Sequence, residues 1–313
     1  VMSVMPAIAA IVVTFNRKAL LTQCLQALLA QSAPLWRIVV IDNASTDGTE
    51  AALRQAGLLD QPIIHYTRLP ENIGGAGGFA HGMQLAFDAG AEWFWLMDDD
   101  AMAKSDALAA LLAIAPQPEH VYGSSAVFRE GEHHMMCWPT VLTAYNADWP
   151  VVIRNHALLP RVAQVMMLPF IGFFISKPMV ERIGYPEAAF FIYADDVDYC
   201  HRARQAGAEV RQVRDSVFFH PRPGDFVLHI AGYRVFCRRM APERRYYDTR
   251  NRIWIARRHQ RHYLFTTLLP SLLFRTVVTL GAEKNPWAQL VATMRGMRDG
   301  LLASPGFAPS RQP

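Results

Sequence analysis

Short apolar runs alternate with longer amphipathic stretches through the first 128 residues of the chain. The short runs end on polar residues, and the longer stretches repeat their apolar positions at helical spacing. This alternation is typical of strand–helix–strand units, which build a largely parallel sheet covered by helices. The predicted strands are residues 8–14, 37–42, 63–68, 93–97 and 121–128, and the predicted helices are residues 18–31, 49–56, 79–89 and 104–115.

The alternation stops near Arg129, where sequence rich in His, Pro and Trp indicates an insertion or a pair of edge strands up to about Pro160. Beyond it we expect a strand over residues 163–168, an aromatic loop over 170–174, a helix over 177–183, an aromatic segment entering a helix over 190–207, and a strand ending at His220. Arg-rich sequence and amphipathic helices follow. The predicted division is therefore a domain of residues 1–220 and a basic, amphipathic helical region of residues 221–313.

The net charge of +4 hides a division along the 313 residues. Residues 1–199 hold 11 Lys and Arg against 20 Asp and Glu, whereas residues 200–313 hold 20 against 7. A basic, aromatic-rich C-terminal part could meet nucleic acid, anionic lipid or a pyrophosphate-bearing substrate, or could simply be a solvated surface. The four cysteines are scattered and form no CxxC pair, which favours a reducing compartment. No apolar stretch reaches the length of a membrane span, and the first one lacks the basic flank of a signal peptide.

Three adjacent carboxylates end the predicted core strand of residues 93–97, namely Asp98, Asp99 and Asp100. Like charges at the end of a buried strand repel one another, so a cation is expected beside them, and a divalent metal carrying a diphosphate is the usual one. The period of two along a strand puts Asp98 and Asp100 on one face and Asp99 on the other. A strand that leaves the core through a polar turn is the simpler alternative.

A glycine-rich segment, residues 74–78, precedes the predicted helix of residues 79–89. Its spacing approaches the G-x-G-x-x-A fingerprint of a dinucleotide-binding oxidoreductase. That fingerprint follows its strand directly, whereas here five residues intervene, so we favour a backbone that approaches a nucleotide-sugar closely. A P-loop is excluded because the chain has no G-K-[ST] sequence.

A second acidic pair, Asp195 and Asp196, follows an aromatic approach and opens a predicted helix. Asp195 suits the N-cap position, and capping alone could account for an acid there. The helix dipole would keep Asp196 ionised and able to accept a proton. His220 ends a further strand; a lone histidine is more often structural, but its position makes it a candidate third metal ligand.

Taken together, five segments resemble the inverting glycosyltransferases of family 2, which have the GT-A fold. The resemblance covers about residues 8–260. Within the family, residues 72–79 and 193–196 look most like bacterial galactofuranosyltransferases, and residues 245–252 are similar to a segment frequent among these and related rhamnosyltransferases. The five segments are residues 14–17, residues 40–49, the acidic triplet, Asp195-Asp196 and His220.

This resemblance implies an α/β GT-A fold, a Rossmann-like mixed sheet that binds nucleotide-sugars and is flanked by helices, with a basic helical extension at the C-terminus. It implies that Asp98, Asp100 and His220 hold Mn²⁺ or Mg²⁺, that Asp196 is the general base, and that Asp195 orients the acceptor. The implied nucleotide-sugar contacts are Thr14, Asn16, Arg17, Asp42, Asn72, Gly74, Gly75, Gly77, Gly78 and Asp99, and the implied acceptor contacts are Phe170, Phe173, Phe174 and Tyr193.

The expected activity is metal-dependent, inverting transfer of galactofuranose from UDP-galactofuranose to a glycan, often lipid-linked, in the synthesis of cell-surface polysaccharide such as O-antigen. Rhamnosyl transfer from dTDP-rhamnose is the alternative donor chemistry, and an NAD-binding oxidoreductase, a nucleotidyltransferase and a nucleic-acid binder are the alternative classes. We expect no nucleic-acid partner, a possible homo-oligomer, and a cytoplasmic protein attached peripherally to the inner face of the membrane. A buried helical hairpin or an oligomer interface would explain the apolar C-terminal helices equally well.

Overall fold

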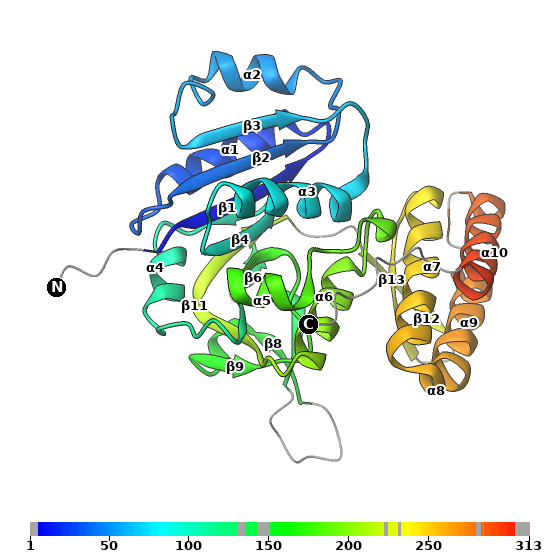
Figure 1. The fold of residues 1–313 in the computed structure, drawn as a ribbon. Helices are drawn as coiled ribbons and strands as arrows, with labels where there is room; N and C mark the ends of the chain where they lie inside the picture. The colour runs from blue at the N-terminus through cyan, green and yellow to red at the C-terminus, as the bar shows by residue number, and fades with distance from the viewer. Residues whose placement is uncertain are drawn as a thin grey trace.

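The computed structural model describes residues 6–129, 135–142, 151–221, 225–230, 233–279, 283 and 285–303. Its centre is a mixed sheet in which β3, β2, β1, β4, β10, β6, β11 and β5 are neighbours in that order, with β7, β8 and β9 attached at the sides (Figure 1). The strands are β1 (Ile8–Thr14), β2 (Arg37–Asp42), β3 (Ile64–Arg68), β4 (Trp93–Asp98), β5 (Met102–Ala103), β6 (Val121–Phe128), β7 (Met135–Leu142), β8 (Val151–Asn155), β9 (Val162–Gln164), β10 (Ile171–Ser176) and β11 (Val210–His220).

The first four strands are parallel, as the alternating pattern predicts, and the strand order reverses between β1 and β4. Thr14 pairs with Asp42 of β2, and Val13 pairs with Asp98 of β4. The carboxyl ends of these three strands therefore lie at one edge of the sheet. In open α/β sheets, ligands bind at the carboxyl edge beside such a reversal.

Helices cover both faces of the sheet because residues along β1 alternate between two hydrophobic clusters. Ile11 packs with α3 (Gly74–Asp88), α5 (Lys177–Ile183) and α6 (Asp195–Gln205) on one face. Val12 packs with α1 (Lys18–Leu29), α2 (Thr49–Gln55) and α4 (Ala107–Leu112) on the other. This is the layering that the apolar strands predict, since both faces of a parallel sheet are buried.

The segment predicted as an aromatic loop is strand β10, which lies antiparallel between β4 and β6 in the middle of the sheet. Phe170, Phe173 and Phe174 are 5%, 0% and 0% exposed. Phe170 and Phe173 pack against Tyr199 with ring centroids 5.8 and 5.7 Å away, and Phe174 stacks on Trp93 at 4.6 Å. The expectation that these phenylalanines bind an acceptor is therefore wrong, because their rings are part of the core.

The edge strands foreseen between residues 129 and 160 are β7 and β8, which pair with each other in antiparallel fashion. A β-hairpin that the sequence did not indicate follows His220. Its strands are β12 (Asp225–Ile230) and β13 (Tyr233–Arg238). Only after this hairpin does the predicted helical region begin.

The C-terminal helices form a bundle beside the sheet, at the right of Figure 1. They have a small core of their own, in which Ile253 packs with Leu264, Leu268 and Leu272. None of the helices among the described residues is both long enough and apolar enough to cross a membrane. The helices are α7 (Pro242–His259), α8 (Arg261–Tyr263), the π-helical turn η3 (Leu264–Leu268), α9 (Leu269–Thr279) and α10 (Pro286–Leu302).

Two glycines allow α10 to approach α7 closely. A Cβ atom on Gly296 would lie 2.7 Å from the carbonyl oxygen of Tyr246, and one on Gly300 would lie 2.8 Å from Cβ of Ile253. Because these residues are four apart, both glycines lie on the same face of α10. The close helix contact therefore depends on glycine at both positions.

Candidate active site

The carboxyl ends of β1 and β4 are joined by contacts between polar side chains. The Thr14 hydroxyl donates to Asp99 Oδ2 at 2.7 Å. Arg17 Nη1 lies 3.2 Å from Asp99 Oδ1 and 2.6 Å from Asp100 Oδ2. Thr14, Arg17 and the acidic triplet, separated by more than 80 residues, thus meet at the reversal in strand order, as the sequence predicts.

His220 reaches the same place from the end of β11. Its Nε2 atom lies 3.4 Å from Asp100 Oδ1. Its Nδ1 atom lies 2.7 Å from the carbonyl oxygen of Pro221, which fixes the orientation of the ring when Nδ1 carries a proton. Asp100 is therefore held between Arg17 on one side and His220 on the other.

The three carboxylates differ in their electrostatic environments. Burial, followed by the charges of Asp100 and Asp99, raises the pKa of Asp98 well above its usual value. Burial would also raise the pKa of Asp100, but hydrogen bonding and charge from His220, with help from Arg17, lower it overall. Burial raises the pKa of Asp99 to about 6, although Thr14 and Arg17 oppose the change. Asp98 is thus the member of the triplet that a further cation would stabilise most.

The predicted metal ligands approach one another without forming a preassembled site. Within the described residues, no three His, Cys, Asp or Glu side chains are arranged closely enough to hold a metal ion. Asp100 and His220 are in contact, and Asp98 interacts with both through its charge. The Asp98 carboxylate itself makes no hydrogen bond or ion pair among the described residues. Two carboxylates and an imidazole suit Mn²⁺ or Mg²⁺, and a cation would offset the repulsion that acts on Asp98. The chemistry of these side chains therefore fits the predicted ion.

Asp195 and Asp196 begin helix α6, but neither is its N-cap. Ala194 occupies that position in the left-handed conformation, with φ of 66°, so the predicted capping role of Asp195 is wrong. Desolvation, followed by the charge of Asp196, raises the pKa of Asp195 to about 8. Desolvation likewise raises the pKa of Asp196 to about 6, while its Oδ1 accepts a 2.7 Å hydrogen bond from the backbone N–H of Val197. At neutral pH these values favour a protonated Asp195 beside an ionised Asp196.

The two acidic groups share one electrostatic environment. The charge of Asp195 contributes to the raised pKa of Asp98, although the two residues are almost 100 positions apart. The site thus combines carboxylates beside a histidine and an arginine with a second carboxylate pair of different proton affinity. Such a combination can bind a phosphorylated donor and also accept a proton.

The residues predicted to meet the nucleotide brace the turn after β2. Asp42 is 1% exposed; its Oδ1 accepts from the Ser45 backbone N–H at 2.7 Å, and its Oδ2 accepts from the Tyr66 hydroxyl. Asn16 has φ of 55°, and its Oδ1 accepts from the Thr46 backbone N–H at 2.7 Å. In this conformation both residues shape the edge of the site. Tyr66 and Ser45 are supporting residues that the sequence analysis missed.

The glycine segment is not a loop before α3, as predicted, but the first turns of that helix. Asn72 Oδ1 accepts from the Gly74 backbone N–H at 2.8 Å at its start. A Cβ atom on Gly74 would lie 2.1 Å from the carbonyl oxygen of Phe191. At Gly77 and Gly78 a Cβ atom would press on side chains of the protein itself, whereas at Gly75 it would make only an ordinary contact, 4.0 Å from the carbonyl oxygen of Phe191. Close packing inside the protein therefore accounts for most of these glycines. The tight glycine turn that a dinucleotide-binding oxidoreductase requires is absent at residues 74–78, because these residues are helical.

The sequence analysis gave no role to residues of α7 that contact the backbone before Asp195. The Asn251 side-chain nitrogen lies 2.9 Å from the carbonyl oxygen of Tyr193, a residue predicted to bind acceptor. Arg250 contacts the same loop through the carbonyl oxygens of Ala189 and Phe190. An asparagine inside a helix is a weak signal of such a contact, because asparagine is a poor helix former.

The fold gives the first comparison with known proteins. The central mixed sheet flanked by helices is shared with GT-A glycosyltransferases of known structure. GalNAc-T7 with UDP, GalNAc and Mn²⁺ superposes with a TM-score of 0.62 at 12% identity, covering 94% of this chain and 54% of that one. The mannosyltransferase PcManGT from Pyrobaculum calidifontis, in complex with GDP-Man and Mn²⁺, superposes with a TM-score of 0.57 at 19% identity, covering 96% and 88%. The chain therefore has the GT-A fold.

Sequence comparison gives the family. The profile described as Glycosyl transferase family 2 matches residues 9–149. Galactofuranosyltransferase GlfT1 of Mycobacterium tuberculosis (strain ATCC 25618 / H37Rv) is 30% identical over 257 residues, which cover 79% of this chain and 81% of the relative. The chain belongs to glycosyltransferase family 2, which confirms the resemblance inferred from its motifs.

Proposed function

We propose that the protein transfers galactofuranose from UDP-galactofuranose to a glycan acceptor, with inversion at the anomeric carbon. The observation that carries this proposal is the grouping of the acidic triplet with Arg17 and His220, close enough to Asp195 for its charge to raise the pKa of Asp98. The likeness to galactofuranosyltransferase GlfT1 over most of the chain supports the choice of sugar.

On the donor side, Arg17 provides positive charge beside Asp99 and Asp100. Asp98, Asp100 and His220 would hold Mn²⁺ or Mg²⁺, and the bound ion would offset the charge on the departing diphosphate. Asp99, held by Thr14 and Arg17, would face the sugar-nucleotide.

In the transfer step, an acceptor hydroxyl oxygen forms a bond to the anomeric carbon while the bond from that carbon to the diphosphate oxygen breaks. The hydroxyl proton passes to the Asp196 carboxylate, and the nucleoside diphosphate leaves with the bonding electrons. A pKa of about 6 keeps Asp196 ionised at neutral pH yet basic enough to take a proton. Asp195, with its higher pKa, would remain protonated and orient the acceptor through a hydrogen bond, together with Tyr193.

Replacement of Asp196 by Asn tests this assignment. The Asp196→Asn variant should transfer sugar at least roughly 100-fold more slowly, because the general base is lost, while its affinity for UDP stays unchanged. Asp215→Asn is a matched control, since Asp215 lies on β11 and, among the described residues, pairs with Arg161 and Arg214 at the surface. Near-normal turnover by Asp196→Asn would contradict the assignment. Turnover with dTDP-rhamnose but not with UDP-galactofuranose would replace the proposed donor.

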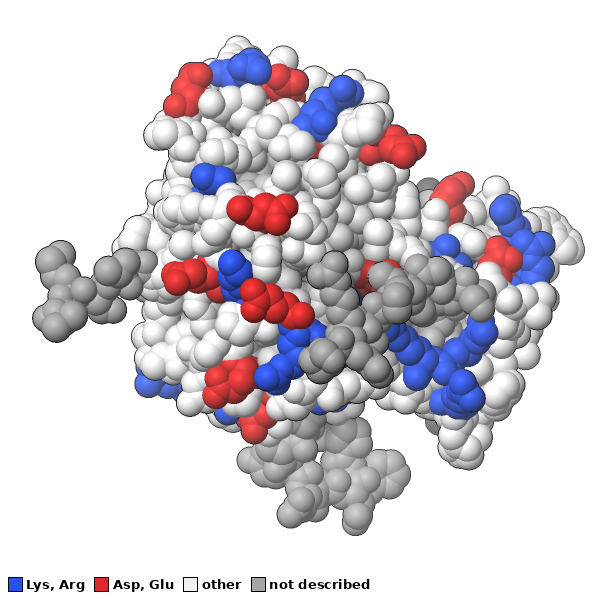
Figure 2. Space-filling model, viewed as in Figure 1, with Lys and Arg blue, Asp and Glu red and all other residues white. Residues whose placement is uncertain are grey.

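The acceptor we propose is a lipid-linked glycan at the cytoplasmic face of a membrane, on which the C-terminal helices rest. Exposed apolar side chains support this proposal: Val277 of α9 and Trp287 of α10 are 70% and 75% exposed. Lys and Arg predominate among the charged side chains drawn over these helices, at the right of Figure 2. Basic helices with exposed aromatic and aliphatic residues suit binding to the surface of an anionic bilayer.

A further inference from the structure

Helix α7 lies against the loop that leads into Asp195 and Asp196. Asn251, in the middle of α7, is 0% exposed. Its side-chain nitrogen lies 2.9, 2.8 and 2.9 Å from the carbonyl oxygens of Phe190, Ile192 and Tyr193. One amide group thus serves three of the last backbone carbonyls before the acidic pair.

The backbone of this loop is strained. Phe191, Tyr193 and Ala194 have φ values of 64°, 67° and 66°, a region that residues other than glycine rarely adopt. Such residues persist only where their surroundings over-determine them, and they cluster at functional sites. The carbonyls that Asn251 binds flank these left-handed residues, so its amide is placed to hold them.

A second residue of α7 fixes the same loop. Arg250 donates to the carbonyl oxygens of Ala189 and Phe190 at 2.8 and 3.1 Å. Its guanidinium lies 4.8 Å from the ring centroid of Tyr247, and that ring in turn stacks on Phe191 at 4.7 Å. The loop is therefore held through both its backbone and its aromatic side chain.

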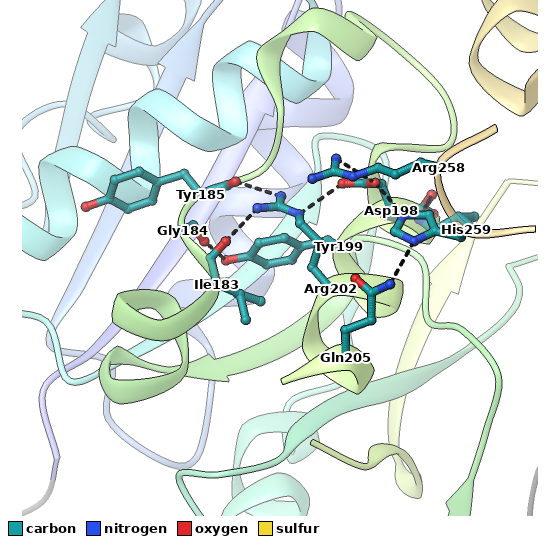
Figure 3. Close-up of polar contacts among 11 residues, drawn as sticks. Ile183, Gly184, Tyr185, Asp198, Tyr199, Arg202, Gln205, Arg258 and His259 are labelled. Atoms are coloured by element: carbon teal, nitrogen blue, oxygen red, sulfur yellow. Dashed lines mark hydrogen bonds and ion pairs between the residues drawn. The ribbon is translucent and has the colours of Figure 1, made fainter. Parts of the chain in front are cut away.

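The end of α7 also contacts α6, the helix that Asp195 and Asp196 begin (Figure 3). Asp198, 1% exposed and two residues after Asp196, pairs with Arg258 at 3.2 Å and His259 at 3.0 Å. Within α6, Arg202 completes the cluster at 2.9 Å from Asp198. Helix α7 thus binds the chain on both sides of the acidic pair.

We infer that Asn251 is a positioning residue for the general base, and that together with Arg250 it supports the loop 190–196. This inference rests on the proposed role of Asp196. Asn251 touches no reacting atom; it acts by fixing the backbone from which Asp195 and Asp196 project. A displacement of about 1 Å in a catalytic group can lower the rate roughly 100-fold, so such support is measurable in turnover.

The test compares Asn251→Ala with Arg252→Gln, since Arg252 is a half-exposed neighbour on α7 that pairs with Asp248 at 2.8 Å. In the full-length enzyme, Asn251→Ala should lower kcat by roughly 10- to 100-fold with KM for the donor within about twofold. The apparent pKa of the acidic limb of the kcat profile should fall toward the ordinary aspartate value, because the loosened loop exposes Asp196 to water. Hydrogen exchange at residues 189–197 should accelerate. Arg252→Gln should leave all of these unchanged, and Asn251→Gln, which keeps the amide, should recover part of the activity.

Two results for Asn251→Ala would contradict the inference. An Asn251→Ala enzyme with unchanged kcat and pH profile, or one whose kcat falls only with its folded fraction, shows a structural role alone. If Asn251→Ala does not fold, Arg250→Lys replaces it in the test. This variant keeps the positive charge but loses the guanidinium that donates to the carbonyl oxygens of Ala189 and Phe190, so the same changes in kcat, pH profile and hydrogen exchange are expected. If the wild-type enzyme fails to transfer sugar, the proposed function has failed, and hydrogen exchange alone then decides whether Asn251 holds the loop.

Discussion

At the residue scale, Asp195 and Asp196 form a pair of adjacent carboxyl groups with different proton affinities. Burial raises the pKa of both groups, and the charge of Asp196 raises that of Asp195 further, to about 8. Enzymes commonly separate the roles of two carboxyl groups by giving them such unlike environments. The same pKa shifts also affect stability, because a carboxyl group that is easier to protonate in the folded state makes folding depend on pH.

The sign follows from the direction of the shift. An unfolded aspartate has a pKa of about 3.9, so the buried pair favours folding most at low pH and loses that contribution as pH rises toward about 8. Relative to wild type, the free energy of unfolding of Asp195→Asn should therefore be higher at pH 8 than at pH 5, by on the order of 2 kcal/mol. Urea denaturation at both pH values, without divalent cations, measures it. If the free energy of unfolding of Asp195→Asn differed from that of wild type by the same amount at pH 5 and pH 8, the raised pKa of Asp195 would be contradicted.

At the scale of single elements, the contact between α7 and α10 sets two effects against each other. Replacing Gly296 by Ala improves helix propensity by about 1 kcal/mol. The added Cβ would, however, lie 2.7 Å from the carbonyl oxygen of Tyr246, which forces the helices apart at a cost of about 1–3 kcal/mol. We therefore expect Gly296→Ala to lower the melting temperature. Met294→Ala, at an exposed position of the same helix, should leave it nearly unchanged. A higher melting temperature for Gly296→Ala would mean that α7 and α10 move apart at little cost.

Strands and helices with a clear apolar period could be predicted from the sequence, and so could the approach of His220 to Asp100. Strand β10 could not, because the run from Phe170 to Ile175 has no polar residue and lacks the alternation that separates strand from loop. Its place between β4 and β6 depends on pairings with residues 50 to 83 positions away. The start of α3 was missed for a related reason, since the glycines that suggest a loop are required by close contacts within the fold.

The supporting contacts of the site were also beyond prediction. Asn251 and Phe190 are 61 residues apart, and no local pattern joins them. Sequence motifs reveal catalytic and ligand-binding side chains, because the types of these residues and their order along the chain are characteristic. Residues that hold a backbone in place have no such signature, since any donor at the right point in space can serve.

At the scale of the whole molecule, the C-terminal bundle presents an apolar surface to solvent. The described part of residues 257–303 contains six arginines and only two acidic residues, Glu283 and Asp299. We expect the enzyme to float with anionic liposomes at low salt and less at high salt, because salt screens the attraction of the arginines. Phe274→Glu combined with Trp287→Glu should weaken flotation, while Leu158→Glu, equally exposed but in the catalytic part, should not. Protein that stays at the bottom in both salts would indicate a soluble oligomer instead.

The attachment of α7 to the loop before Asp195 limits where two such transferases can be joined to make a hybrid enzyme. Grafting the C-terminal part of one transferase onto the sheet of another is an obvious way to change acceptor choice, and the end of β11 at His220 looks like the natural joint. A hybrid joined there would keep the acidic triplet and the acidic pair, yet its foreign helix would have to supply donors for the carbonyls of Phe190, Ile192 and Tyr193. A hybrid that keeps the native chain through His259 avoids that requirement, so the exchangeable unit begins after α7, provided that it keeps glycine where Gly296 and Gly300 meet that helix.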